Sequence, residues 1–588
     1  MLLTVSNKVK TENWSSNLGV VLAVAGSAIG FGNFLRFPGL AAQYGGGAFM
    51  IAYFCAFLLM GIPLSWVEWS IGRKGGRLNG HSAASIFYLI SRSRYWKYLG
   101  LTGVVIPLCI AMYYIALEGW TLGYAWHMAV GDLNFNSSAE YGEFFGNFTG
   151  ANKDGAVFFS GESTLLIFFI IALMANFYLL YRGVSKGIEW FSKVSMPILL
   201  LTAIIVLVRV LTMGTPDETY PNRNVNQGLG YMWNPDKVVL VDTTNINANT
   251  GQPQVLDMVP AGATEAEQTA QITRLQQEYP KADIQRREIS LWEGLCNPEL
   301  WIAAAGQIFY SLSIGYGIVC TYASYVKRGN DIALGSLTAN SANEVAEVGL
   351  AGMMIIPAAV SLLGVAAAAG AGTFGLGFNV LPQVFNSMPG GDFFGTLFFV
   401  LLSIGAITSA ISILQPAVAF VEEFWSLRRV QSVCLVALML MVGTLIVIWF
   451  TGNGLLALDT LDFWVGTMSL YISSALFLFM FRNVWGTPAG LAELRSGAAI
   501  PIGRNIAFLI NWVTPCIMVT IFGSWLYQNL FIKQSKHITN IIEGKAGAIF
   551  PLVWVVLVTL FFCFIVRTSR RFKHGENLET KYDREPFS

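Results

Sequence analysis

Charged residues are scarce in this chain. They make up 12% of its 588 residues, against about 25% in typical soluble domains, while hydrophobic residues make up 54%. The formal net charge of +1 argues against nucleic acid as a partner, because domains that bind nucleic acid are strongly basic. This composition excludes an ordinary soluble globule and indicates a polytopic membrane protein.

Cysteine and histidine are also few, and neither occurs in a pattern that binds metal. The seven cysteines have no CxxC spacing and most stand inside apolar runs, and the four histidines are isolated. The GxGxxG match at 370–375 follows an apolar helix rather than a strand, and no phosphate loop or nucleophile elbow occurs. We therefore expect neither an enzyme nor an organic cofactor.

Long apolar runs make up most of the chain. Twelve runs are long enough to cross a bilayer. They lie near residues 17–42, 47–72, 98–129, 164–182, 187–212, 297–326, 335–369, 391–424, 431–451, 457–481, 505–528 and 546–568. The sequence therefore predicts an all-α membrane protein with twelve transmembrane helices.

The basic residues predict how these spans are oriented. Lys and Arg gather in every second loop and near both ends of the chain, whereas the alternate short loops hold few. By the positive-inside rule the terminal segments 1–16 and 569–588 are cytoplasmic, and the expected location is the lipid bilayer of a bacterial inner membrane. The polar stretch 213–296, with a helix-like run at 263–276, is then an extracytoplasmic insertion, either a surface excursion or a partner-binding segment.

Helix-breaking residues interrupt the first span. Residues 26–32 contain three glycines and a serine, and the polar side chains of Asn33 and Arg36 follow. Broken helix at membrane depth is tolerated only where it lines a protein cavity or water. The freed carbonyls can hold a cation and the half-helix N-terminus can hold an anion, so this pattern predicts a transport site.

A second broken span follows the first at a regular distance. Residues 307–317 of the sixth span again combine glycines with hydroxyl side chains in mid-membrane. Because the two breaks are five spans apart, the second copy of the unit must be inverted relative to the first. We expect a first repeat at 17–212, a second repeat at 297–481, and two further spans at 482–568.

Several short motifs follow one another along the chain. They are Trp14, Arg36-Phe37-Pro38, Gly45-Gly46-Gly47-Ala48-Phe49, Gly61-Ile62-Pro63 with Glu68-Trp69, Tyr113-Tyr114 with Glu118, Asn343-Glu344, Thr408-Ser409 with Gln415-Pro416, and Asp462-Phe463-Trp464. Over about residues 11–568 the chain resembles the neurotransmitter:sodium symporters, and most of all bacterial LeuT-like amino acid transporters. The resemblance implies a LeuT-like fold with a 5+5 inverted repeat and broken helices 1 and 6.

The resemblance also implies two sodium sites. The first would use the Ala28 and Ser311 carbonyls, the Ser311 hydroxyl, the Asn33 and Asn343 amides, and the carboxylate of the substrate. The second would use the Gly26, Ile29 and Gly405 carbonyls with the Thr408 and Ser409 hydroxyls. Hard oxygen ligands of this kind suit alkali and alkaline-earth cations. Taken alone, a Thr-Ser pair would more often bond back onto its own helix.

By the same resemblance, the site binds a substrate with both an amino and a carboxylate group. The carboxylate would meet the Phe31 and Gly32 amides and the Tyr114 hydroxyl; the ammonium would meet the Ala28, Tyr310 and Ser311 carbonyls and the Ser313 hydroxyl. The side-chain pocket would be drawn from Ser27, Ile110, Tyr310, Tyr316, Ser409, Ser412 and Ile413, although core packing alone would explain the tyrosines. Gly30 stands where amine carriers have aspartate, and no charge faces the pocket, so a neutral amino acid is expected.

Three charged positions match gating residues of the family. Arg36 and Asp462 match the outer pair, above a lid of Tyr114 and Tyr310. Glu423 stands at the inner gate where aspartate is usual. Thr11 replaces the inner arginine, which leaves Lys8 or Lys10 as candidate partners.

The position of Glu347 bears on whether transport requires chloride. It follows Asn343 by four residues and therefore lies on the same helix face, at a position where chloride-dependent relatives have a neutral residue. Its carboxylate, near Tyr53, Gln307, Ser311 and Asn343, would replace chloride and carry a proton back after the cargo leaves. The alternative is a permanently protonated glutamate.

These expectations combine into one function. We expect a sodium-coupled symporter that imports a neutral amino acid by alternating access, independent of chloride, with proton counter-transport. A carrier of a betaine or γ-amino acid, or a non-transporting amino-acid sensor of the same fold, stays open, as does a homodimer.

Overall fold

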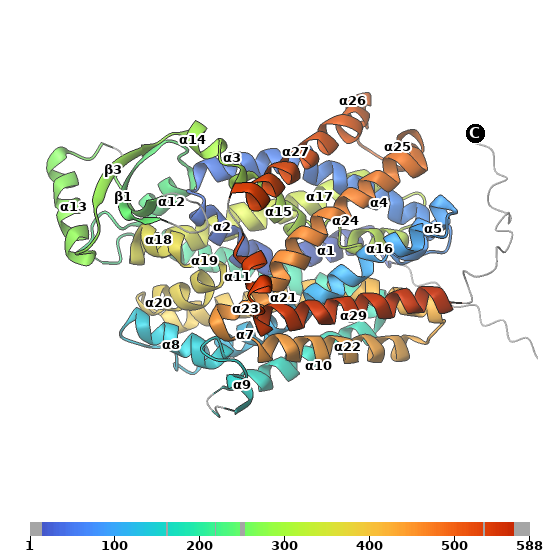
Figure 1. Cartoon of the computed structure of the whole chain (residues 1–588), viewed down its shortest axis with the longest axis horizontal. Helices are drawn as coiled ribbons and strands as arrows, with labels where there is room; N and C mark the ends of the chain where they lie inside the picture. Colours follow the sequence, from blue (N-terminus) through green and yellow to red (C-terminus); the bar gives the residue numbers. More distant parts are fainter. Residues whose placement is uncertain are drawn as a thin grey trace, which may run out of the picture.

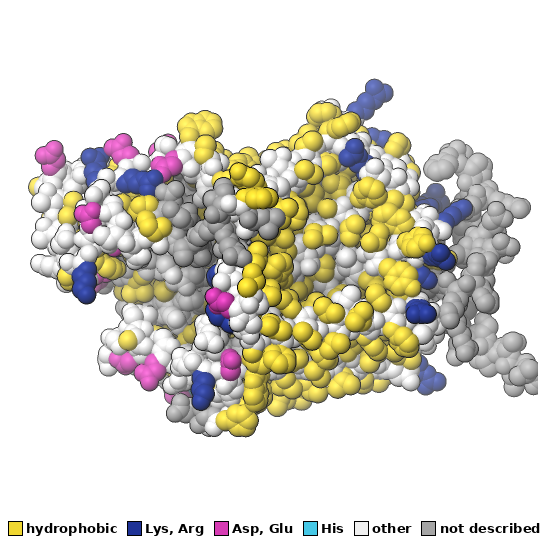
Figure 2. Space-filling model, in the orientation of Figure 1, with side chains coloured by type: hydrophobic (Ala, Val, Ile, Leu, Met, Phe, Trp, Pro, Cys, Tyr) yellow, Lys and Arg dark blue, Asp and Glu magenta, His cyan; other side chains and the backbone are white. Residues whose placement is uncertain are grey.

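Long helices run side by side along the long axis of the molecule, and a small sheet lies at one end (Figure 1). The computed structural model describes residues 14–159, 161, 163–217, 219–246, 253–260, 262–532 and 535–569. Hydrophobic side chains cover the visible flank of the helices, Lys and Arg gather at the end opposite the sheet, and the sheet end carries both signs of charge (Figure 2). The apolar flank is the surface that a membrane would cover.

The first five expected spans are helical. Their elements are α1 (Asn17–Ala28), η1 (Gly32–Arg36) and α2 (Phe37–Gln43); α3 (Gly47–Ala56), η2 (Phe57–Gly61) and α4 (Ile62–Arg77); α6 (Trp96–Leu99) and α7 (Thr102–Ala129); α10 (Leu165–Tyr181); η3 (Val184–Glu189) and α11 (Trp190–Leu211). Shorter helices α5 (Ala83–Ser91), α8 (Ser138–Thr149) and α9 (Ala156–Phe159) connect them. Elements labelled η are π-helical turns, which add a residue to the helical repeat.

The later spans are built in the same way. Their elements are α15 (Pro298–Ser311) and α16 (Ile318–Ser324); α17 (Ile332–Glu344), η4 (Val345–Gly352) and α18 (Met353–Gly370); α21 (Gly391–Trp425); α22 (Arg429–Trp449); α23 (Gly452–Leu461), η6 (Asp462–Ser469) and α24 (Leu470–Phe479); α26 (Arg504–Phe508), η8 (Leu509–Val513), α27 (Thr514–Tyr527) and η9 (Gln528–Ile532); and α29 (Ala546–Thr568). Between them lie α19 (Gly372–Gly375), η5 (Leu376–Val380), α20 (Leu381–Asn386), η7 (Met480–Gly486), α25 (Thr487–Arg495) and α28 (Lys536–Ile542).

The number of spans is close to the predicted twelve. In the described part of the chain, nine helices are long and apolar enough to cross a membrane, and the pair Asn17–Ala28 and Gly32–Gln43, bent by 42°, makes ten. The two remaining predicted spans are α10, which is apolar but only 17 residues long, and span six, which is divided into α15 and α16. A polytopic helical protein is thus confirmed, while the count of twelve stays a prediction.

The expectation of an all-α chain is wrong for the insertion. It contains α12 (Val225–Trp233), β1 (Lys237–Ile246), β2 (Pro253–Met258), α13 (Glu265–Glu278), β3 (Ile284–Ile289) and α14 (Leu291–Leu295). The strands form an antiparallel sheet in the order β2-β1-β3. Residues 237–242 are rich in valine, and β-branched side chains favour strands. The helix expected at 263–276 is present as α13.

The sheet is covered on both faces. One face packs against α13 through Leu240, Leu256 and Leu275, and Ala366 of α18 belongs to the same apolar cluster. Val239 and Val241 belong instead to the main core of the molecule. The insertion is therefore built into the end of the helical body and is not a separate domain.

Candidate functional site

The first break separates α1 from η1. Helix α1 ends at Ala28, and Ile29 adopts an extended conformation with φ −80° and ψ 103°. The side-chain carbonyl of Asn33 accepts a hydrogen bond of 2.8 Å from the Gly30 amide, which would otherwise lack a partner. A Cβ atom on Gly30 would lie 2.5 Å from Ser409 Oγ and 2.6 Å from the Tyr114 hydroxyl, so no side chain fits there.

The second break separates α15 from α16. Ser313, Gly315 and Gly317 have positive φ angles of 55°, 84° and 71°, which end regular helix. The carboxylate of Glu68 accepts a hydrogen bond from the Gly315 amide, and Ser473 donates to the Gly315 carbonyl at 2.7 Å. A hydrogen bond of 3.3 Å from the Ser313 hydroxyl to the Ser27 carbonyl connects the second break to the first.

Polar side chains from three spans meet beside the two breaks. Asn33 donates to the Asn343 side-chain carbonyl at 2.8 Å, and Asn343 donates to the Ser311 hydroxyl at 2.7 Å. These three side chains are at most 1% exposed. All three residues are predicted for the first sodium site, and the structure brings them together. Their role as sodium ligands stays a prediction.

Glu347 is the centre of this polar cluster. It is fully buried, and its carboxylate accepts hydrogen bonds from Asn33 at 3.0 Å, Asn343 at 3.2 Å, Gln307 at 2.6 Å and the Ser311 hydroxyl. All four donors are uncharged. A buried carboxylate with no cation beside it is costly unless a bound cation or a proton compensates its charge.

The residues expected at the second sodium site also lie together. Ser409 on α21 donates to the Gly26 carbonyl of α1 at 3.4 Å, across the two helices. Thr408 instead donates to the carbonyl of Gly405, on its own helix, at 2.9 Å. A Cβ on Gly405 would lie 3.3 Å from the Ile29 carbonyl, so the broken backbone passes close to α21. The Thr408 hydroxyl therefore bonds back onto its own helix, as an isolated Thr-Ser pair often does, whereas the Ser409 hydroxyl bonds to span one.

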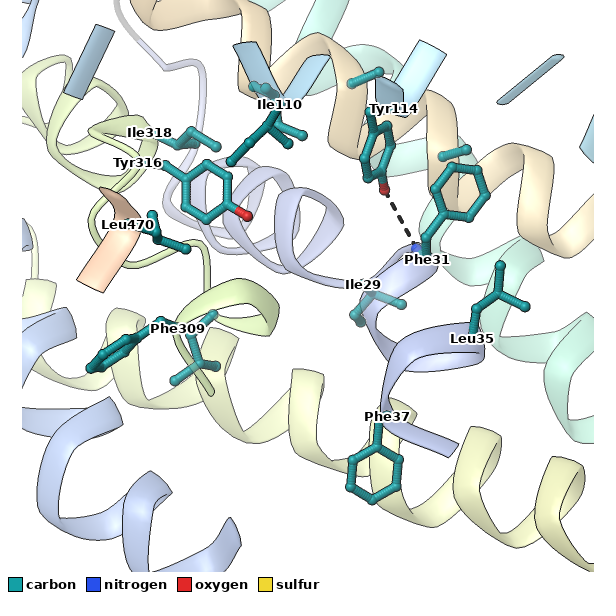
Figure 3. Close-up of a cluster of buried hydrophobic side chains, with 14 of the residues drawn as sticks. Ile29, Phe31, Leu35, Phe37, Ile110, Tyr114, Phe309, Tyr316, Ile318 and Leu470 are labelled. Carbon is teal, nitrogen blue, oxygen red and sulfur yellow. Dashed lines mark hydrogen bonds between the residues drawn. The ribbon is translucent and has the colours of Figure 1, made fainter. Parts of the chain in front are cut away.

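Aromatic side chains surround the first break. The Tyr114 hydroxyl accepts a 3.4 Å hydrogen bond from the Phe31 amide, and Figure 3 shows this ring pointing at the broken backbone, with Tyr316 on the far side of Ile110. The rings of Tyr310 and Tyr316 are 6.3 Å apart. Deeper in the molecule, Tyr322 donates to the Ser412 hydroxyl at 2.7 Å. The remaining predicted pocket residue, Ile413, is buried on α21.

A cavity of about 690 Å³ leads from the surface to the first break. Its lining includes Phe31, Tyr310 and the predicted gate residues Arg36 and Asp462. Arg36 Nε lies 3.8 Å from Asp462 Oδ2, and the guanidinium stacks 4.9 Å from the centre of the Tyr310 ring. At this distance Arg36 and Asp462 could move closer together and close the path, because a hydrogen bond between charged groups becomes stronger when water is excluded.

The predicted inner gate is only partly described. The Glu423 carboxylate accepts hydrogen bonds from the His81 amide at 2.5 Å, the Ser82 amide at 3.1 Å and the Ser85 hydroxyl at 2.7 Å, at the start of α5. The candidate partners Lys8, Lys10 and Thr11 lie outside the described residues. The gate role of Glu423 therefore stays a prediction.

Two contacts of the outer path were not predicted from the sequence. The expected neighbour of Glu347, Gln307, also accepts a 3.0 Å hydrogen bond from Arg36 through its amide carbonyl, and so connects Glu347 to the outer path. Tyr113 donates to Asp462 at 3.0 Å and so fixes the partner of Arg36. Gln307 and Tyr113 belong to segments that the sequence singles out, but their contacts with Arg36 and Asp462 follow only from the packing.

A family model confirms the class of this protein. The model described as the sodium:neurotransmitter symporter family matches residues 11–143 and 284–569. The chain belongs to this family, whose members are transporters and not enzymes. Residues 144–283, which include most of the sheet-containing insertion, lie outside the match.

Individual relatives agree with this assignment. An uncharacterized sodium-dependent transporter of Methanocaldococcus jannaschii is 26% identical over 94% of this chain and 98% of its own length. An uncharacterized sodium-dependent transporter of Bacillus subtilis is 27% identical, over 87% of this chain and 97% of its own. The crystal structure of MhsT in complex with L-phenylalanine aligns with a TM-score of 0.68 at 25% identity, covering 87% of this chain and 99% of MhsT. Both of these transporters are described as sodium-dependent, and this chain matches nearly the whole length of each.

Removing the hydroxyl of Thr408 or Ser409 should weaken sodium binding. Each alanine variant deletes a hydroxyl that is predicted to bind sodium, so the sodium concentration for half-maximal uptake should rise at least about tenfold, equivalent to about 1.4 kcal/mol. Ser403→Ala, on the same helix as Thr408 and Ser409, is the matched control, because the Ser403 hydroxyl bonds to Thr121 of α7 at 3.1 Å, away from the break. Unchanged sodium dependence in both variants would show that this cluster is not a sodium site.

Arg36→Ala should open the outer path. Arg36 donates to Gln307 at 3.0 Å and Thr467 at 3.3 Å, and these bonds are lost together with the pair to Asp462. If they contribute about 1 kcal/mol, labelling of a cysteine at Phe31 should accelerate about fivefold. The experiment uses a background in which the exposed Cys296, Cys434 and Cys516 are serine, with Thr467→Val as the milder comparison. Equal labelling rates with and without Arg36 would show that Arg36 does not close the outer path.

Proposed function

We propose that this protein is a sodium-coupled symporter that moves a neutral amino acid inward by alternating access. The observation that carries the proposal is the meeting of both broken spans with Asn33, Ser311, Asn343 and Glu347 in one buried cluster. Oxygen atoms of this cluster would hold one sodium ion, and those around Ser409 a second. Both termini would then be cytoplasmic, and the 690 Å³ cavity would open to the outside.

The proposed cargo follows from the space around Gly30. A substrate that lacks a carboxylate would need one from the protein, and the contacts at Gly30 leave no room for an aspartate side chain. A substrate with its own carboxylate would complete the first sodium site. The described pocket residues Ile110, Tyr316 and Ile413 are uncharged, so a charged cargo side chain would be left without a partner. MhsT, a relative with a solved structure, was crystallised in complex with L-phenylalanine.

Glu347 supports transport without chloride. Its carboxylate already lies where the cluster needs one negative charge, and four donors hold it there. While sodium is bound, the two opposite charges compensate each other. When sodium and substrate leave, we propose that Glu347 takes up a proton for the return step, since an unpaired buried carboxylate is unstable.

Substrate and sodium binding should be coupled. If the substrate carboxylate shares the first sodium ion, each ligand must strengthen the binding of the other by the same factor. Amino acid affinity, measured with the purified protein by scintillation proximity, should fall at least about tenfold, or about 1.4 kcal/mol, when potassium replaces sodium. Asn343→Ala should reduce this difference, because it removes one proposed ligand of the shared ion. Equal affinity in the two salts would contradict the proposal.

Glu347→Ser should make transport respond to chloride. The variant removes the fixed negative charge and leaves space that an anion can fill, so its uptake should be low in gluconate and recover in chloride. The unmodified protein should take up substrate equally in both salts. An outward-directed proton gradient should speed its uptake, because the proposed return step carries a proton out. Glu143→Gln, which changes an exposed glutamate of α8 away from the cluster, is the control and should not respond to chloride. Chloride-dependent uptake by the unmodified protein would overturn the assignment.

A further inference from the structure

A second cavity lies between the insertion and the helical body. It has a volume of about 120 Å³, and it is lined on one side by the sheet and on the other by residues at the outer ends of spans one, two and seven. Gln43 and Tyr44 line both this cavity and the larger one that leads to the first break. The insertion therefore encloses a small space that shares the lining residues Gln43 and Tyr44 with the proposed entry path.

The walls of this cavity are mainly apolar. Side chains alternate along a strand, so Lys237, Val239 and Val241 of β1 point to the same face of the sheet, and all three line the cavity. Val255 of β2 and Ile289 of β3 complete that face. Arg287 and Glu293 also line the cavity but form an ion pair with each other, so their charges compensate.

Lys237 is the unusual residue of this cavity. Its side chain is 9% exposed and carries an ammonium group that donates to the Gly45 carbonyl at 2.5 Å and the Tyr231 carbonyl at 2.8 Å. The Tyr231 ring lies 4.5 Å from the nitrogen. Among the described residues no carboxylate lies within ion-pair distance of Lys237, although an ammonium has three N–H donors. A buried cation without an anion is costly, and a bound anion would offset that cost.

We propose that this cavity binds a small apolar carboxylate, with the carboxylate on Lys237 and the hydrocarbon part between the sheet and the outer end of span one. An engineered cavity of about 150 Å³ accommodates benzene, so about 120 Å³ suits a ligand of roughly six non-hydrogen atoms. Butanoate has this size and this combination of groups. A long acyl chain is too large, which separates the proposed ligand from the surrounding lipids.

The site is distinct from the proposed transport site in position and in chemistry. It recognises a carboxylate and an apolar chain, without an amino group and without sodium. Lys237 and the other lining residues of β1 and β2 lie within residues 144–283, which the family model does not match. Because Lys237 holds the Gly45 carbonyl after α2, a ligand on Lys237 would also act on the end of broken span one.

Butanoate binding can be measured by thermal unfolding of the purified full-length protein in potassium salts at constant ionic strength. Sodium is left out so that ligand binding at the proposed transport site does not contribute to the change in unfolding temperature. Butanoate should raise the unfolding temperature in a saturable way, since a ligand of the folded state stabilises it by mass action. Butanamide, which has nearly the same shape but no charge, should not. Equal shifts with both compounds would contradict the proposal.

Two variants locate the binding. Lys237→Met keeps the length of the side chain but removes its charge, and the dissociation constant of butanoate should rise at least about tenfold; Lys281→Met removes an exposed lysine of the same insertion and should leave it unchanged. Ala369→Leu fills the cavity without touching the charge and should also abolish the shift. If Lys237→Met fails to fold, Ala369→Leu decides the test. Undiminished binding in Ala369→Leu would place butanoate elsewhere and overturn the proposal.

The pH dependence gives an independent readout. Burial lowers the pKa of Lys237 to about 7, so part of the population is uncharged at neutral pH. The other titratable groups around it are Tyr44, Tyr231, Arg287 and Glu293, and burial raises the pKa of Tyr231 above its usual range. Since the carboxylate needs charged Lys237, butanoate affinity should be highest below pH 7 and fall up to about tenfold per pH unit above it. A flat profile between pH 6 and about 9 would contradict the role of Lys237.

Discussion

The whole structure depends on one constraint, that backbone groups inside a membrane need hydrogen-bond partners. Spans one and six break this rule at Ile29 and at residues 312–317, and the protein compensates with side chains. Asn33 accepts from the Gly30 amide, and Glu68 accepts from the Gly315 amide. The Gly30 and Gly315 amides are thereby satisfied, and Ser473 and Ser313 donate to the carbonyls of Gly315 and Ser27. The carbonyls of Ala28 and Ser311 are the ones that we propose as ligands of a cation.

Glu347 gives this arrangement its charge balance. The carboxylate lies among four uncharged donors, and Gln307 connects it to Arg36 in the outer path. Closing the path and filling the cluster therefore involve one continuous set of hydrogen bonds. Through this network the occupancy of the site can influence the gate. When ligands bind or leave, Glu347 and Gln307 change their hydrogen-bond partners, and Gln307 is also a partner of Arg36.

The sequence predicted the helical class, both breaks and the grouping of Asn33, Ser311 and Asn343, because glycines and polar residues inside apolar runs are strong local signals. It did not predict the sheet, since the valine-rich run at 237–242 is short and one of its strand partners, β3, follows only after α13. Nor did it predict the environment of Lys237 or the direction of Gln307. Those features depend on which elements pack together, and a single sequence carries little information about that packing.

The central claim is that a sodium gradient drives the cargo. The most direct test is accumulation of a labelled neutral amino acid in proteoliposomes that contain the purified protein, with sodium outside and potassium inside. The account predicts accumulation above the external concentration, followed by rapid loss when a sodium ionophore dissipates the gradient. Binding without accumulation would indicate a sensor of the same fold. Accumulation that persists after the ionophore would contradict sodium coupling itself.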